Sequence, residues 1–224
     1  MSEYSYDKVT PVTAHDGMAA NLYHEVFGQV GSVLNVAAGD TRLHDSLQLY
    51  GVATDIVSVD PAYARPEYSG REGYVAGLAQ ELPFADESFD SAMCQFGLQH
   101  IPMEDIPATI HEMIRITRTA DENRDQTKGY ILLNPVFKNV RLEKALAGFN
   151  DDVAFLWHHD GAGMTGLERR ALYPTLVIHK TPDLTPETEQ DLVNRIVASR
   201  SLKPTHRSIG EVVSRRLFGG SSRA

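Results

Sequence analysis

Hydrophobic runs of strand length alternate with amphipathic segments over the first two thirds of the chain. The runs predict five strands, at residues 32–37, 55–60, 74–77, 88–97 and 130–136. Two of the intervening segments, 42–51 and 104–118, place hydrophobic residues at helical spacing. Strands that alternate with helices favour a mostly parallel sheet covered by helices.

After residue 136 the pattern changes. Residues 139–149 predict a helix, and a further helix should begin at Thr185-Pro186-Glu187. Between these helices, residues 152–159 and 174–180 are strand-like, and the turn-rich connection between them is too short for a long crossover helix. The two strands are therefore expected to form an antiparallel pair, which brings the predicted strands to seven.

Composition excludes several classes of protein and of site. Cys94 is the only cysteine, so neither an intramolecular disulfide nor a multi-cysteine zinc site can form. No run of about 18 apolar residues is present, and the N-terminus lacks the basic and apolar regions of a secretory signal. We therefore expect a cytoplasmic protein with no membrane partner.

The charge is unevenly distributed along the chain. The formal net charge is −9, which argues against nucleic-acid binding for the chain as a whole. Residues 199–224, however, carry six arginines and lysines against a single acidic residue, Glu211. We interpret this stretch as a solvated chain end, and the alternative is a basic tail for an anionic partner such as RNA.

Small and polar residues follow the predicted strands at the points where a ligand would bind. Residues 37–41 form a small-residue turn, Asp60 follows the second strand, and residues 77–79 and 95–97 follow the third and fourth. In an open parallel sheet, ligands bind beyond the carboxyl ends of the strands where the strand order reverses. A carboxylate at that edge can accept hydrogen bonds from ribose hydroxyls.

The segments VLNVAAGDT, IVSVD, LAQELPFADESFDSAMCQFGLQHI and GYILLNPV resemble, in order and spacing, the class I S-adenosylmethionine-dependent methyltransferases. The resemblance covers residues 30–136 and is greatest to the branch with an LPF…SFD motif before the fourth strand. It implies an α/β fold: a Rossmann-like, seven-stranded, mostly parallel sheet with helices on both faces and a C-terminal antiparallel strand pair. It also implies S-adenosyl-L-methionine as the cofactor.

The resemblance assigns cofactor contacts to nine positions. In chain order they are Asn35, Ala37, Gly39, Thr41, Asp60, Leu78, Ala79, Gln95 and Phe96. The first four would lie under the methionine and ribose, Asp60 would hold the ribose hydroxyls, the next two would flank the adenine, and the last two would lie beside the methyl group. The family usually has an acidic residue at Asn35, glycine at Ala37 and Thr41, and often aspartate at Leu78.

Histidines are the candidates for a general base, which is required only if the acceptor must lose a proton. His100 is the first candidate because of its position after the fourth strand, and His158 and His159 are the second. Adjacent histidines on a strand point to opposite faces, so no metal site is expected at residues 157–160.

The sequence thus predicts a methyltransferase that acts on an O, N or C atom of an unidentified acceptor, with a small molecule favoured. The alternatives are a non-catalytic or regulatory binding protein on the same fold and a methyltransferase acting on RNA. A nicotinamide-dependent enzyme is disfavoured because residues 36–41 lack the G-x-G-x-x-G spacing. Residues 1–31 are expected to cap the site as a helical segment, 32–182 to form the methyltransferase-like domain, and 183–224 to form a helix and the basic tail. The sequence does not indicate the oligomeric state.

Overall fold

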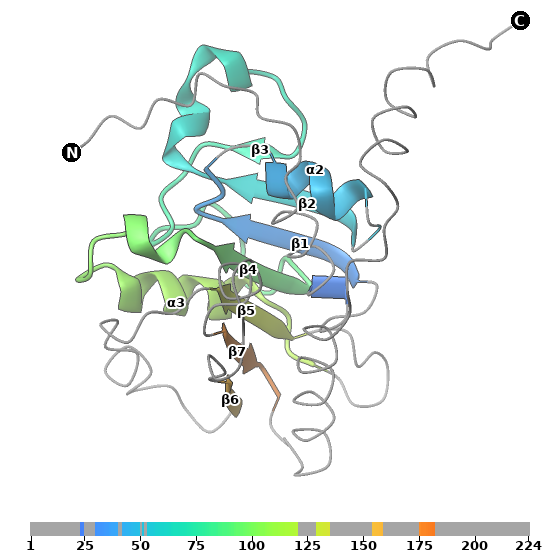
Figure 1. Ribbon diagram of the computed structural model, residues 1–224, viewed down its shortest axis with the longest axis vertical. Helices are drawn as coiled ribbons and strands as arrows, with labels where there is room; N and C mark the ends of the chain where they lie inside the picture. The colour runs from blue at the N-terminus through green and yellow to red at the C-terminus, as the bar shows by residue number, and fades with distance from the viewer. Residues whose placement is uncertain are drawn as a thin grey trace, which may run out of the picture.

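The computed structural model of the chain describes residues 23–24, 30–39, 42–49, 51, 53–120, 129–134, 154–158 and 175–181. Seven strands form one mixed sheet (Figure 1). They are β1 (Val30–Val36), β2 (Ala53–Val59), β3 (Tyr74–Val75), β4 (Ser91–Gln95), β5 (Tyr130–Asn134), β6 (Ala154–His158) and β7 (Thr175–His179). The described helices are α2 (Arg42–Leu49) and α3 (Ile106–Ile116), together with three 3₁₀ turns, η1 (Pro61–Ala64), η2 (Pro66–Tyr68) and η3 (Leu98–His100).

The strands lie in the order β3-β2-β1-β4-β5-β7-β6. The pairs β1–β2, β2–β3, β1–β4 and β4–β5 are parallel, whereas β7 is antiparallel to both β5 and β6. The chain builds outward from β1 to β3 and then crosses back to place β4 on the other side of β1. The order therefore reverses between β1 and β4, whose carboxyl ends form the edge at which open α/β sheets bind ligands.

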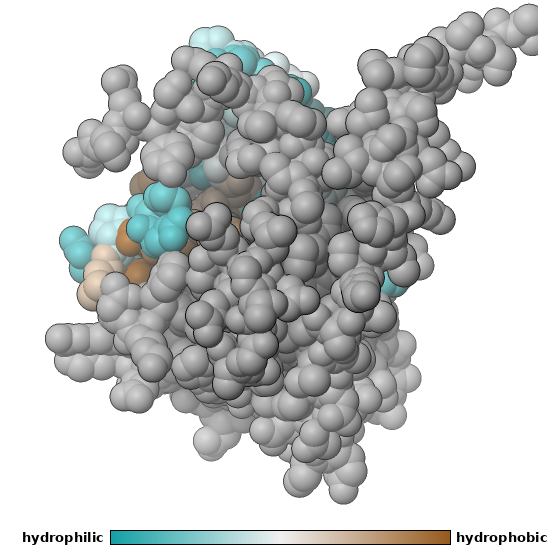
Figure 2. All heavy atoms as spheres, in the orientation of Figure 1, coloured by the Kyte–Doolittle hydropathy of each residue, from teal (hydrophilic) through white to brown (hydrophobic). Residues whose placement is uncertain are grey.

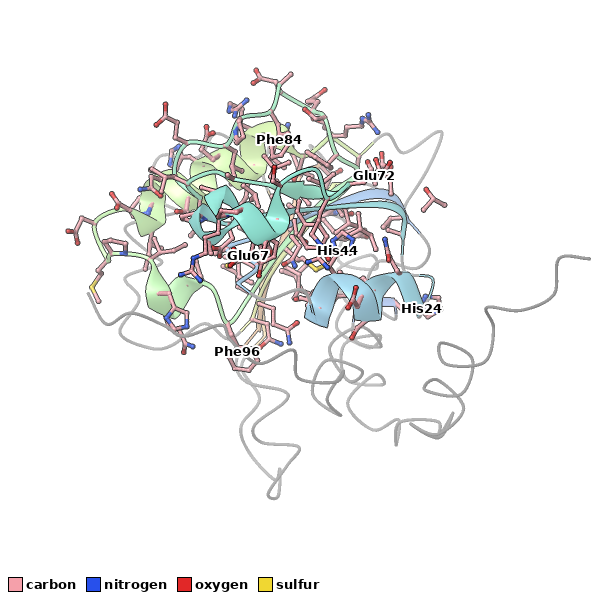
Figure 3. The ribbon with its side chains drawn as sticks, turned by 90° about the horizontal axis from the view of Figure 1, so that it is seen from above. His24, His44, Glu67, Glu72, Phe84 and Phe96 are labelled. Carbon is pink, nitrogen blue, oxygen red and sulfur yellow. The ribbon has the colours of Figure 1, made fainter. Side chains whose placement is uncertain are left out.

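The two described α-helices lie on opposite faces of the sheet (Figure 3). On the α3 face, alternate residues of the strands are buried in one hydrophobic core with the helix, as Leu34 on β1, Cys94 on β4 and Leu133 on β5 illustrate. Ile110 and Met113 supply the helix side of this core, and each is fully buried. Burial of each large side chain stabilises the fold by roughly 1.5–3 kcal/mol.

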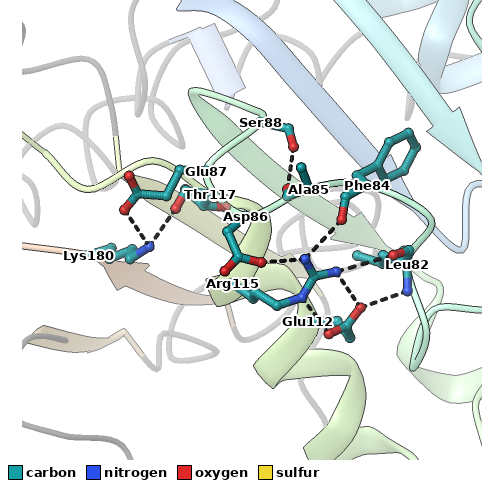
Figure 4. Close-up of polar contacts among 10 residues, drawn as sticks. All are labelled: Leu82, Phe84, Ala85, Asp86, Glu87, Ser88, Glu112, Arg115, Thr117 and Lys180. Atoms are coloured by element: carbon teal, nitrogen blue, oxygen red, sulfur yellow. Dashed lines mark hydrogen bonds and ion pairs between the residues drawn. The ribbon is translucent and has the colours of Figure 1, made fainter.

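The loop that carries the LPF…SFD motif is fastened to α3 by one guanidinium (Figure 4). Arg115 donates hydrogen bonds to the carbonyls of Leu82 at 3.2 Å and Phe84 at 2.9 Å. It also pairs with Asp86 and Glu112, each at 2.7 Å. Glu112 in turn accepts a hydrogen bond from the Leu82 N–H at 2.8 Å. The motif therefore has a structural explanation as an anchored loop that leads into β4.

A second anchor holds the entry to β4 and the exit from α3. The Asp90 carboxylate pairs with Arg118 at 2.6 Å and accepts a hydrogen bond from the Ser32 N–H on β1 at 2.9 Å. Lys180, after β7, donates to the Thr117 carbonyl at 2.8 Å, which ties the β7 side of the sheet to the end of α3.

The predicted mixed sheet with flanking helices is confirmed, and the element ends differ for local reasons. Helix α3 stops at Ile116 rather than at residue 118 because Thr117 is extended and forms a bridge with Phe89. Strand β4 is shorter than the predicted 88–97 because Phe96 adopts a left-handed φ of 52°. The predicted helices at 139–149 and after Thr185, and nearly all of the expected N-terminal capping segment and the basic tail, lie outside the described residues. Among the described helices, none is both long and apolar enough to cross a membrane.

Candidate cofactor and acceptor site

The candidate site lies at the carboxyl ends of β1, β2, β4 and β5, where the arrowheads of β1 and β4 point to the left in Figure 1. The turn after β1 is joined to β2 by a hydrogen bond from the Ala38 N–H to the Val59 carbonyl at 3.2 Å. Figure 2 shows hydrophobic side chains of the described residues at the same edge. The edge is therefore a joined set of strand ends with some apolar surface.

Asp60 connects two of these strand ends. One carboxylate oxygen accepts a hydrogen bond from the Gly39 N–H at 2.9 Å, and the other accepts from the Ala62 N–H at 2.8 Å. Asp60 thus caps η1 and holds the β1 turn at the same time. Its side chain is half-buried, and a carboxylate can accept about four hydrogen bonds. Acceptor capacity remains for a pair of ligand hydroxyls.

Ala37 and Gly39 give the β1 turn its shape, and the turn lies against the end of β4. Their φ angles are 50° and 62°, both in the left-handed region. A β-carbon added at Gly97 would lie 2.7 Å from the β-carbon of Ala37. The sequence departure at Ala37 thus falls at a position that does require positive φ, which an L-residue adopts at a cost of roughly 1–2 kcal/mol. Thr41 lies outside the described residues.

Asn35 is fully buried on the α2 face, and a polar network orients its carboxamide. Its Nδ2 donates to the Ser58 hydroxyl at 3.3 Å, and the same hydroxyl lies 3.0 Å from His44 Nδ1 on α2. His44 Nε2 lies 3.2 Å from the side-chain nitrogen of Gln48, which can only donate. With Gln48 in this orientation, a neutral His44 ring carries its proton on Nδ1 and donates it to Ser58.

This network has two consequences for the site. Burial lowers the pKa of His44, an effect that Asp45 opposes and Arg71 reinforces, so the ring is held neutral. Because Asn35 Nδ2 is committed to Ser58, its Oδ1 is left as a buried acceptor to which no described residue donates. A hydrogen-bond donor or a cationic group is the natural partner of this oxygen.

The remaining predicted contacts lie after β3 and β4. Leu78 is 46% exposed, whereas Ala79 is buried. The Phe96 N–H donates to the Asn134 carbonyl at 2.7 Å, and the ring projects from the end of β4 (Figure 3). Gln95, just before it, has a buried side-chain oxygen to which no described residue donates. The structure thus brings the residues after β1, β2 and β4 to one edge.

His100, the predicted general base, is exposed on η3, one turn beyond Gly97. Its backbone N–H donates to the Gly97 carbonyl at 2.9 Å, and its Nε2 lies 3.1 Å from the side-chain nitrogen of Gln99. It is therefore close in sequence and in fold to the β4 end. His158 ends β6, and its side chain, like the whole of His159, lies outside the described residues.

Two other kinds of chemistry would need a thiol nucleophile or a bound metal ion. Cys94 is fully buried, and burial raises the pKa of its thiol to about 12, so it serves as a core residue rather than a nucleophile. Within the described part of the chain, no group of three or more His, Cys, Asp or Glu side chains could hold a metal ion.

Sequence reasoning missed Ser58, His44 and Asn134. Ser58 and His44 are ordinary polar positions in a strand and a helix, and only the pairing of Asn35 with Ser58 across β1 and β2 reveals their network. Asn134 had a visible signal, a polar residue that ends a continuous apolar run, but nothing in the sequence paired it with Gln95.

Comparisons with known proteins agree with this geometry. Residues 34–120 match a family model described as a methyltransferase domain. A demethylmenaquinone methyltransferase from Beutenbergia cavernae is 38% identical over 90 residues, which cover 38% of this chain and 36% of that protein. A protein of the same name from Mycobacterium sp. (strain KMS) is 52% identical over 44 residues, which cover 20% of this chain and 18% of that protein. The matches thus span about a third or less of the length of these curated relatives.

A solved structure is similar in fold. A putative S-adenosyl-L-methionine-dependent methyltransferase from Methanococcus maripaludis superposes with a TM-score of 0.53 at 13% identity, over 77% of this chain and 87% of that one. At that identity the likeness concerns the fold alone. Residues 34–120 thus match a methyltransferase domain, and the strand order and the site at the β1–β4 reversal resemble those of the class I S-adenosylmethionine-dependent methyltransferases.

Proposed function

We propose that the chain is an S-adenosylmethionine-dependent methyltransferase that transfers a methyl group to an O, N or C atom of a small-molecule acceptor. The observation that carries the proposal is the position of Asp60, which follows β2, holds the β1 turn at Gly39 and lies beside the β1–β4 reversal. The names of the curated relatives support a small-molecule acceptor.

The described residues fit the cofactor. Asp60 has acceptor capacity for the ribose hydroxyls, and the exposed Leu78 side chain supplies apolar surface for the adenine. Asn35 Oδ1, to which no described residue donates, suits the cationic methionine end. When bound, S-adenosylmethionine supplies a methyl group already activated by a sulfonium.

The protein's own contribution is then chiefly positioning. Holding the acceptor in line with the methyl group can supply about 7–11 kcal/mol of barrier reduction in favourable cases. His100 is the proposed general base for an acceptor that must lose a proton. Its exposure lets the proton pass on to water.

A second acceptor class, RNA, rests on the basic residues 199–224 alone. Deleting them should flatten the salt dependence of RNA binding if they form the RNA-binding arm. An unchanged salt slope would remove this alternative.

Calorimetric titration with S-adenosylmethionine and S-adenosylhomocysteine tests the proposed function. The full chain should bind both, and Asp60→Asn should weaken binding at least tenfold because one oxygen is replaced by a donor. Asp55→Asn, exposed on β2, the strand just before Asp60, is the matched control and should bind normally. Absence of binding by the folded wild-type chain would instead favour a non-catalytic binding protein on this fold.

A further inference from the structure

Two carboxamides lie side by side at the carboxyl ends of β4 and β5. Gln95 and Asn134 are register partners in this parallel pair. Their strand neighbours Cys94 and Leu133 point into the core on the α3 face, so both carboxamides belong to the opposite face. Asn35 lies on that same face, because Leu34 and Val36 are in the α3-side core.

The side-chain oxygens of this pair are buried acceptors that lack donors. Asn134 is 2% exposed, and neither its Oδ1 nor Gln95 Oε1 accepts a hydrogen bond from any described residue. Folded proteins pair nearly all buried polar atoms with protein, water or a ligand. Other buried oxygens of the described residues, such as Thr109 Oγ1, also lack a partner, but Gln95 and Asn134 are neighbours at the ligand-binding edge, where a ligand can supply the donor.

The order of the strands indicates which ligand, cofactor or acceptor, the two carboxamides would contact. From β2 to β5 the edge carries Asp60, then Asn35 and Ala37, then Gln95, and finally Asn134. With the ribose at Asp60 and the methionine end at β1, Asn134 lies on the side away from the ribose. The hydrogen bond from the Phe96 N–H to the Asn134 carbonyl fixes the two strand ends together at 2.7 Å. The pair therefore faces the space beyond the transferred methyl group.

We propose that Gln95 and Asn134 form the acceptor subsite, and that their side-chain oxygens bind a neutral O–H or N–H group of the acceptor. Two amide oxygens present partial negative charge, so the pair disfavours a carboxylate or phosphate at the same place. A carboxamide orients the acceptor but does not take its proton at neutral pH. The inference rests on the proposed function and names the chemical class of its substrate.

Four probes that share one ring system distinguish the effect of a hydrogen-bond donor on binding from the effects of charge and of ring shape. They are 2-naphthol, 2-naphthylamine, 2-methoxynaphthalene, which has no donor, and the anion 2-naphthoate. Binding is followed by NMR of the Asn and Gln side-chain amides, with and without S-adenosylhomocysteine. We expect the naphthol or the amine to bind at least tenfold more tightly than the ether and the anion and to shift the Gln95 and Asn134 signals. Equal affinity of all four probes would overturn the inference.

Variants keep the test specific to the subsite. Asn134→Leu should lose the preference for the donor over the ether, whereas Asn134→Asp, which keeps an acceptor oxygen, should retain it. Gln99→Leu, exposed on η3, is the control and should bind as the wild type does. S-adenosylhomocysteine affinity should be unchanged in Asn134→Leu, and its loss would assign Asn134 to the cofactor site and overturn the inference. If the wild type fails to bind S-adenosylhomocysteine while the probe preference persists, the proposed function fails and the donor-binding subsite stands.

Discussion

Gly97 leaves no room for a side chain because Ala37 lies against it: an added β-carbon would be 2.7 Å from the Ala37 β-carbon and 2.6 Å from Cys94 Sγ. The two residues belong to the turn after β1 and the end of β4, the strands between which the sheet order reverses. The absence of a side chain at Gly97 thus lets these two strand ends pack closely against Cys94 in the core.

Gly97→Ala should lower the free energy of unfolding by about 1–3 kcal/mol, since overpacking forces neighbouring atoms to shift. Urea denaturation measures the change. In an Ala37→Gly background the same substitution should cost less, because one of its two clashing neighbours has been removed. An identical cost in both backgrounds would show that the contact with Ala37 does not matter.

Ala37→Gly should leave stability unchanged or raise it by up to about 1 kcal/mol. It removes the strain of an L-residue at a φ of 50°, and the greater freedom of glycine in the unfolded chain offsets part of the gain. Ala92→Gly, in the buried middle of β4, is the matched control and should be destabilising. Thermal unfolding of the two variants decides the matter, and equal losses in both would contradict the assignment of strain to Ala37.

The free energy of unfolding should decrease as the pH is lowered below about 6.5. His44 has a folded-state pKa below its unfolded value, so the unfolded chain binds more protons in that window and is favoured as the pH drops. Protonation would also make Nε2 a donor facing the Gln48 side-chain nitrogen. His44→Gln should reduce the difference in unfolding free energy between pH 7.5 and pH 5.5. A variant with the full wild-type pH dependence would show that another group is responsible.

Arg115→Ala should destabilise the chain by about 1–3 kcal/mol, because the carbonyls of Leu82 and Phe84 lose their donor and Glu112 loses its partner. The effect should be local as well, with faster proteolysis at residues 82–88. Arg115→Lys should rescue little, since a single ammonium cannot reproduce the planar fork that reaches all four partners. Full rescue by lysine would show that charge alone holds the loop.

Hydrophobic patterning was sufficient to predict the architecture. The apolar runs at 32–37 and 130–136 correspond to β1 and β5, and the helical spacing of hydrophobic residues over 104–118 predicted α3. The predicted ends were less accurate, because they depend on backbone angles such as that of Phe96 and on pairings such as Phe89 with Thr117.

The candidate site was predictable only at positions where the residue type by itself suggests a role. Asp60 after a strand is recognisable in the sequence as a candidate ribose ligand, and the fold places it at the predicted edge of the sheet. The orientation of Asn35 depends on Ser58, 23 residues away, and on His44, so it follows from the tertiary structure alone. The same holds for the pairing of Gln95 with Asn134, whose segments are separated by all of α3.

Hydrogen–deuterium exchange with and without S-adenosylhomocysteine tests the central claim, that the cofactor binds at the β1–β4 reversal. We predict slower exchange in peptides that contain residues 36–39, 59–62 and 95–98, and unchanged exchange at 82–88 and 111–116, which hold the loop on α3. Protection confined to other segments, or no protection at saturating ligand, would contradict the account.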